Sequence, residues 1–166
     1  MFNFKKYNIS LPSEYYKAVK IGAPIFPILF EFENGLRLAI NNFLSSIYGN
    51  DWWEIKLKSR YFDAYKYVAD QKAKRDKMPW IGDSSRTTLI PLHSVTIGHL
   101  EQIVIKFQSE CIPQLFPTIQ FFTGHMEIVK RVRNMYSHMY PCIDKEDIED
   151  AISEIKIISK HIKNKI

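Results

Sequence analysis

The stretch RNMYSH, residues 133–138, ends a long helical segment and is followed by MYP, residues 139–141. An arginine guanidinium is always charged and can hold two phosphate oxygens at once. A histidine can give or take a proton near neutral pH. Arg133 and His138 therefore suit a site that handles a phosphodiester. Asn134 lies four residues before His138, so the two share a face of a continuous helix.

The geometry of this stretch depends on where the helix ends. On a continuous helix Arg133 lies about 140° around the axis from His138, because each residue advances by about 100°. The two side chains converge only if the helix ends near His138. Pro141 predicts such an end, because a proline disfavours helix in the residue before it. The alternative is a plain helix C-terminus at which His138 interacts with unpaired carbonyls.

Length and composition indicate one globular domain over residues 1–166. Hydrophobic residues make up 46% of the chain and charged residues 25%, as in soluble proteins with a packed core. The net charge of +5 permits an anionic partner without requiring one.

The chain carries no signal for export or membrane insertion, so we expect a cytoplasmic protein. Cys111 and Cys142 have no Cys-x-x-Cys spacing and are expected to be reduced thiols. No apolar run follows the first lysines, which argues against a signal peptide. The apolar run at residues 21–32 is short and holds two prolines and a glutamate, so no membrane span is expected.

Apolar residues recur at steps of three and four, which predicts an all-α fold. The pattern and the breaker residues predict a brief helix over 14–20, a loop over 78–93, and longer helices over 27–48, 52–77, 96–107, 118–138 and 144–162. Side chains suited to cap helix N-termini precede four of them, namely Asp51, Thr96, Thr118 and Asp144. Asp147 follows Asp144 by three residues as a variant of the capping box.

Polar residues at four-residue steps form a stripe on the predicted helix 27–48. Glu33, Arg37 and Asn41 share this stripe, and Glu33 can pair with Arg37 across one turn. The alternative is an ordinary solvated face.

Residues 56–77 carry eight basic and three acidic side chains, with aromatic residues between them. A basic face with aromatic side chains suits RNA, through phosphate contacts and base stacking. Lys72, Lys74 and Arg75 are the candidate RNA-binding residues. The alternative is a charged helix with a buried aromatic side.

The other histidines have no spacing typical of metal ligands, and no glycine-rich phosphate loop is present. We therefore expect no metal site and no cofactor.

Three segments together resemble the HEPN domain (higher eukaryotes and prokaryotes nucleotide-binding) of abortive-infection-like proteins. The hallmark of that family is Arg-x4-6-His with a polar residue after the arginine, here Arg133, Asn134 and His138. The stretch FENGLR, residues 32–37, leading to GNDWW, residues 49–53, is the second similarity. Leu92–Phe107, where TIGHL opens a helix, is the third.

The resemblance implies a helical bundle of about five helices that dimerises along the motif helix. A two-fold axis would bring Arg133 and His138 of both protomers into one cleft. It also implies a metal-independent endoribonuclease, of the kind found in toxins and anti-phage defence. The RNA 2′-hydroxyl would attack its own phosphate, while His138 moves a proton and Arg133 stabilises charge. Asn134 would orient the phosphate or the histidine, with Glu33 and Arg37 supporting Arg133.

Two other functions fit the resemblance. Some HEPN proteins resemble non-catalytic RNA-binding or scaffold modules. Others resemble the toxin half of a pair, held by an antitoxin or by a nucleotidyltransferase that modifies a tyrosine two residues after the histidine. Tyr140 stands at that offset and is the candidate for modification, although Pro141 departs from the usual sequence there.

Overall fold

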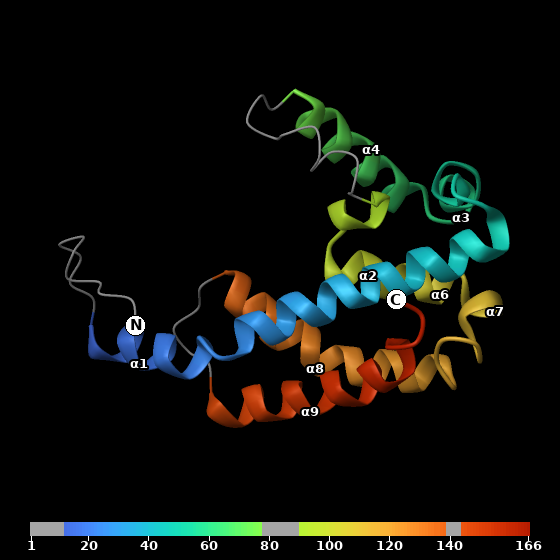
Figure 1. Ribbon diagram of the computed structural model, residues 1–166. Coiled ribbons are helices and arrows are strands. Elements are labelled where there is room, and N and C mark those ends of the chain that lie inside the picture. The colour runs from blue at the N-terminus through green and yellow to red at the C-terminus, as the bar shows by residue number, and fades with distance from the viewer. Residues whose placement is uncertain (1–11, 78–89, 139–143) are drawn as a thin grey trace.

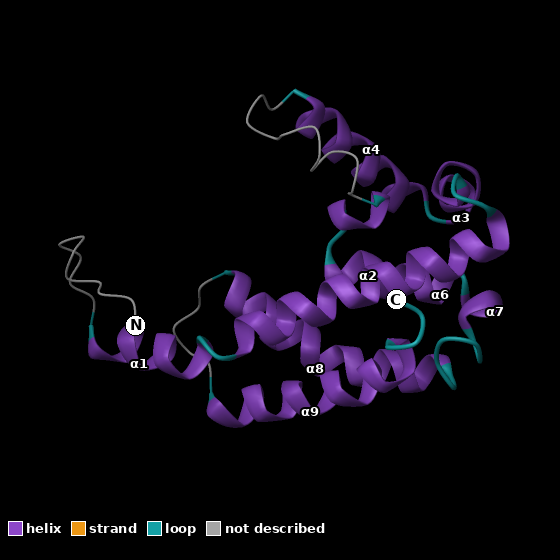
Figure 2. Ribbon diagram, viewed as in Figure 1, coloured by secondary structure: helices purple, strands orange, loops and turns teal. Residues whose placement is uncertain are grey.

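The computed structural model describes residues 12–77, 90–138 and 144–166 (Figure 1). Every regular element within these ranges is helical, which confirms the predicted all-α class (Figure 2). The elements are α1 (Ser13–Gly22), α2 (Ile25–Tyr48), a π-helical turn (Trp53–Leu57), α3 (Lys58–Arg60), α4 (Phe62–Asp76), a 3-10 turn (Pro91–Ser94), α6 (Ile97–Lys106), α7 (Gln108–Cys111), α8 (Ile119–Ser137) and α9 (Lys145–Ile162).

Helices α2, α6, α8 and α9 build the body of the molecule. Helices α8 and α9 form an antiparallel pair, and α2 runs along it (Figure 1). Their apolar stripes meet in one core, because an amphipathic helix is stable only when that stripe is covered. Fully buried side chains from the four helices include Leu36, Ile40, Leu44, Leu100, Ile103, Phe122, Met126, Val129 and Ile158.

Three of the predicted helix starts are confirmed with their caps. The hydroxyl of Thr96 accepts the backbone N–H of His99 (3.2 Å), and that of Thr118 accepts the N–H of Phe121 (3.0 Å). The carboxylate of Asp144 accepts the N–H of Glu146 (3.3 Å). Local sequence sets these starts, because a capping residue acts within one turn of itself.

The predicted single helix over residues 52–77 is wrong. The chain breaks at Tyr61 (φ −148°, ψ 74°), between α3 and α4. Trp52 and Arg60 both lie against the ring of Phe107, at 5.8 and 4.7 Å from its centroid. On a straight helix they would be about 12 Å apart along the axis, so the chain must bend around Phe107. The bend sends α4 away from the body of the molecule (Figure 1).

Two further expectations need correction. Pro91–Ser94, inside the predicted loop over 78–93, forms a 3-10 turn, and residues 78–89 lie outside the described ranges. The carboxylate of Asp147 pairs with Arg131 (2.7 Å), so it serves the α8–α9 contact. The expected number of about five helices also omits the short segments α1, α3 and α7. Within the described ranges, no helix has the length and apolarity needed to cross a membrane.

Candidate functional site

Helix α8 ends where the sequence predicted. Its last residue is Ser137, and His138 leaves the helix with φ −90° and ψ 5°. The backbone N–H of His138 still bonds the carbonyl of Asn134 (3.0 Å), while the Ser137 hydroxyl bonds that of Arg133 (2.8 Å). The buried side chain of Val132 anchors this last turn in the core.

Glu33 is the centre of the polar cluster beside this helix end. Its carboxylate pairs with Arg37 one turn later on α2, so the predicted Glu33–Arg37 contact is confirmed. It also accepts the Nε–H of Arg133 (3.1 Å) and an Nη–H of the same guanidinium (3.4 Å). The Glu33 side chain is only 11% exposed. A carboxylate so deeply buried needs charged partners, and here two guanidiniums supply them.

Arg37 connects this cluster to a distant part of the chain. Its Nε donates to the carbonyl of Leu92 (3.0 Å), and one of its Nη atoms donates to that of Val95 (2.9 Å). A third contact goes to the side-chain oxygen of Asn34 (3.2 Å). Protein acceptors thus occupy this guanidinium on several sides. Arg37 is therefore a positioning residue rather than a group offered to a ligand.

Arg133 differs from Arg37 in its access to solvent. Its two contacts with Glu33 use one edge of the guanidinium, and the side chain keeps 26% of its surface exposed. An arginine has five N–H donors in a planar fork. The edge that faces away from Glu33 can therefore bind an anion while the ion pair holds the side chain in place.

A cavity of about 260 Å³ opens beside Arg133, between α2 and the end of α8. One part of its lining is polar and holds Glu33, Asn34, Arg37, Arg133 and Ser137. The other part is aromatic and comes from Phe26 and Phe30 of α2 and Tyr136 of α8.

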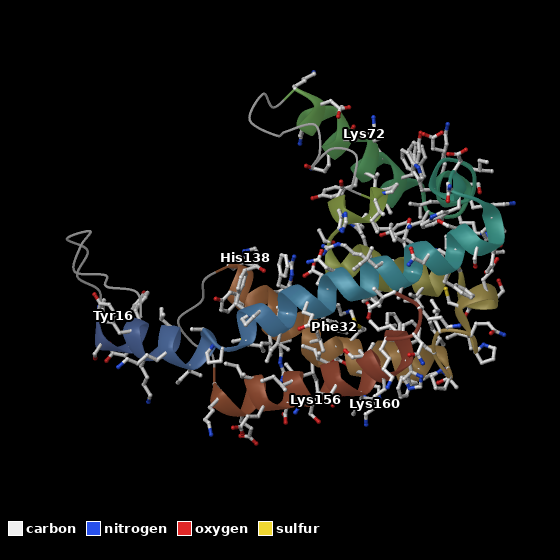
Figure 3. All side chains as sticks on the ribbon, viewed as in Figure 1. Tyr16, Phe32, Lys72, His138, Lys156 and Lys160 are labelled. Atoms are coloured by element: carbon white, nitrogen blue, oxygen red, sulfur yellow. The ribbon has the colours of Figure 1, made fainter. Side chains whose placement is uncertain are left out.

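The structure does not bring every predicted site residue into this cavity. Asn134 and His138 are both exposed, and neither is among the residues that line it. His138 directly follows Ser137, which does line the cavity, and it stands at the end of α8 (Figure 3). The predicted proton-transfer group thus lies at the cavity rim. Tyr140 lies outside the described residues.

The basic residues predicted to bind RNA lie on α4, apart from the cavity. Lys72 and Lys74 are exposed, and Lys72 pairs with Asp76 one turn later (3.3 Å; Figure 3). The backbone of Arg75 belongs to α4, while its side chain lies outside the described part. Asn41, the third residue of the polar stripe on α2, accepts a bond from the indole N–H of Trp52 (3.3 Å) and is structural.

Sequence reasoning missed the aromatic part of the cavity lining. Phe26 and Phe30 are four residues apart, so they share a face of α2. That face differs from the buried stripe through Leu29, Phe32 and Leu36. Two phenylalanines at helical spacing outside the core stripe were the available signal.

Other reactive groups in the described residues do not form a second site. Burial, aided by the Glu110 carboxylate, raises the pKa of the Cys111 thiol to about 12, so it is not a nucleophile near neutral pH. No group of three or more His, Cys, Asp and Glu side chains in these ranges is arranged to hold a metal ion.

We compared the chain with models of protein families, with curated proteins and with solved structures, and none of them matches it.

Proposed function

We propose that this protein is a metal-independent endoribonuclease whose reaction is carried by Arg133 and His138. The observation that supports it most is the Arg133 guanidinium, which a buried carboxylate holds at a cavity while one edge stays open. The end of α8 at Ser137 adds to it, because His138 then follows the cavity lining directly. This arrangement suits a phosphate group bound beside a proton-transfer group.

The substrate supplies its own nucleophile in this reaction. The 2′-oxygen of a ribose loses its proton to a neutral His138 and attacks the adjacent phosphorus. The bond from phosphorus to the 5′-oxygen then breaks, and that oxygen takes up a proton. The products are a 2′,3′-cyclic phosphate and a 5′-hydroxyl. Arg133 stabilises the negative charge that grows on the phosphoryl oxygens, and Asn134 orients the phosphate.

The reaction needs one group that accepts a proton and another that donates one. A homodimer whose two-fold axis passes beside the end of α8 would supply His138 from each protomer. In the cell, we propose, the dimer acts in the cytoplasm as a toxin or anti-phage effector. An antitoxin or nucleotidyltransferase partner would hold it inactive, the latter through Tyr140.

The test is cleavage of total cellular RNA in excess EDTA, followed by analysis of the ends. We expect a 2′,3′-cyclic phosphate and a 5′-hydroxyl, and no cleavage of DNA, which lacks the 2′-hydroxyl. His138→Ala should lower the rate about 10²–10⁴-fold. Arg133→Lys should also lower it, because an ammonium cannot hold Glu33 and a phosphate with a planar fork.

Cleavage only with added divalent metal, or an undiminished rate in His138→Ala, would overturn this function. The second candidate is then an RNA-binding or scaffold module. The exposed lysines of α4 favour it, since phosphate contacts alone give affinity without chemistry.

A further inference from the structure

Two phenylalanines on α2 are unusually open to solvent beside the candidate site. Phe26 is 53% exposed and Phe30 is 63% exposed, although Leu29 between them is buried. Apolar side chains gathered on one face, with polar groups beside them, typically mark a ligand or partner site. Both phenylalanines line the cavity that also holds Arg133.

The rings form a continuous aromatic surface with Tyr136. Phe26 stacks on Tyr136, with centroids 5.9 Å apart and ring planes 29° from parallel. Phe30 extends the surface at 6.3 Å from Phe26. Tyr136 follows Arg133 by three residues on α8, so the aromatic surface and the guanidinium are neighbours on one helix face.

A ligand that matches both parts must present a flat ring close to an anion. A nucleotide has this composition, because its base stacks on aromatic rings while its phosphate binds a guanidinium. A base held in a duplex cannot present its face in this way, so the ligand must be single-stranded or locally unpaired.

The polar groups at the aromatic surface do not select one base. Asn34 is the amide nearest to these residues in sequence, and the protein already engages it. Its Nδ2 donates to the carbonyl of Phe30 (2.8 Å), and its Oδ1 accepts from Arg37 (3.2 Å). Stacking then dominates over reading of the base edge, and stacking tolerates every base.

We propose that Phe26, Phe30 and Tyr136 form a stacking platform for one unpaired nucleobase of an RNA strand whose phosphate lies at Arg133. The proposal deepens the proposed function and rests on it for the identity of the ligand. It assigns a preference for unpaired RNA with little choice of base at this position.

A binding experiment tests the platform without relying on cleavage. The probe is a short single-stranded RNA with 2′-O-methyl groups, which removes the nucleophile, and a single 2-aminopurine. We expect saturable quenching of 2-aminopurine fluorescence by stacking. The same strand with an abasic unit at that position should bind about tenfold more weakly or worse.

Variants then locate the contact. Phe26→Ala with Phe30→Ala should abolish quenching and weaken binding of the base-containing strand to the level of the abasic strand. Binding of the abasic strand should not change. Phe30→Trp should retain quenching. Phe62→Ala is the matched control, because Phe62 is a 56% exposed phenylalanine on α4. If the double variant fails to fold, Phe30→Ala alone gives the same comparison.

Three outcomes would overturn the platform. One is equal affinity for the abasic and base-containing strands, and another is unchanged quenching in the double variant. The third is loss of the dimer in the double variant, which would make the phenylalanines a subunit interface. These results are separate from the proposed function: a protein can cleave without the platform, and His138→Ala can leave quenching intact.

Discussion

At the residue scale, the site depends on Glu33. Its carboxylate is shared by Arg37 and Arg133, so three charges lie within one buried cluster. Each guanidinium keeps a partner only while the carboxylate is present. Breaking a buried ion pair by removing one member is strongly destabilising, because the remaining charge is left without compensation.

Glu33→Gln should therefore lower the free energy of unfolding by about 3 kcal/mol, as seen when one partner of a buried pair is lost. It should also lower the rate of RNA cleavage, because Arg133 is no longer held. Urea denaturation and the cleavage assay measure the two effects. The control is Glu31→Gln at an exposed position two residues earlier, which should change stability by less than about 0.5 kcal/mol. Equal stability of the two variants would show that Glu33 does not bear this role.

At the element scale, the parts of the fold that depend on local sequence were predictable. Thr96 and Thr118 cap helices through neighbours three residues away, and Glu33 reaches Arg37 across one turn. The break at Tyr61 was not predictable in this way. It depends on Phe107, nearly fifty residues later, and nothing in the periodicity of residues 52–77 reports that contact.

The same distinction applies to the candidate site. The spacing of Arg133 and His138 and the end of their helix could be derived from sequence. The ion pair from Glu33 to Arg133 joins residues one hundred positions apart, and only the resemblance suggested it. The aromatic lining needs α2 and α8 to be side by side, which composition cannot report.

The start of α6 should be sensitive to acid through His99. The ring Nδ1 of His99 accepts the backbone N–H of Thr96 (3.4 Å), which requires an unprotonated nitrogen. Burial lowers the pKa of His99, against the opposing effect of Asp63. A lowered folded-state pKa contributes stability that is present above the unfolded value of about 6.5. That stability is lost as the pH falls through the folded-state value.

We therefore expect the free energy of unfolding to decrease between pH 7.5 and pH 5, with a smaller decrease in His99→Gln. Denaturant titrations at a series of pH values measure it. An identical pH dependence in the variant would assign the loss to other groups. His161→Gln, at the end of α9, is the comparison histidine variant.

Helix α4 should contribute phosphate contacts. Lys72→Ala, Lys74→Ala and Arg75→Ala together should weaken RNA binding and flatten its dependence on salt, because fewer counterions are released. For a single strand the slope should fall by about 0.7 for each lost contact. Fluorescence titrations at several salt concentrations measure it.

The matched control removes the same charge from another exposed helix face, at Lys156, Lys160 and Lys163 near the end of α9. If both triple variants lower the slope equally, RNA senses only the net charge of the protein. An unchanged slope in the α4 variant would make that helix an ordinary solvated face.

At the scale of the whole molecule, we expect a homodimer. Within one protomer, a single Arg133 and a single His138 supply half of the groups that the proposed reaction uses. The exposed phenylalanines beside them lie on the same side of α2. Light scattering at micromolar concentration should give twice the mass of the 19.6 kDa chain. A monomer mass with undiminished cleavage would remove the shared cleft from the mechanism.

The contacts of Arg37 have a consequence for how the molecule opens. One guanidinium holds the carbonyls of Leu92 and Val95 and, through Glu33, the end of α8. Three stretches of chain are thus joined at a single point, and none of them can separate without exposing a buried charge. We expect them to behave as one cooperative unit of local unfolding. Their amide hydrogens should exchange with deuterium at a common rate, and Arg37→Met should speed all three together while leaving α9 slow.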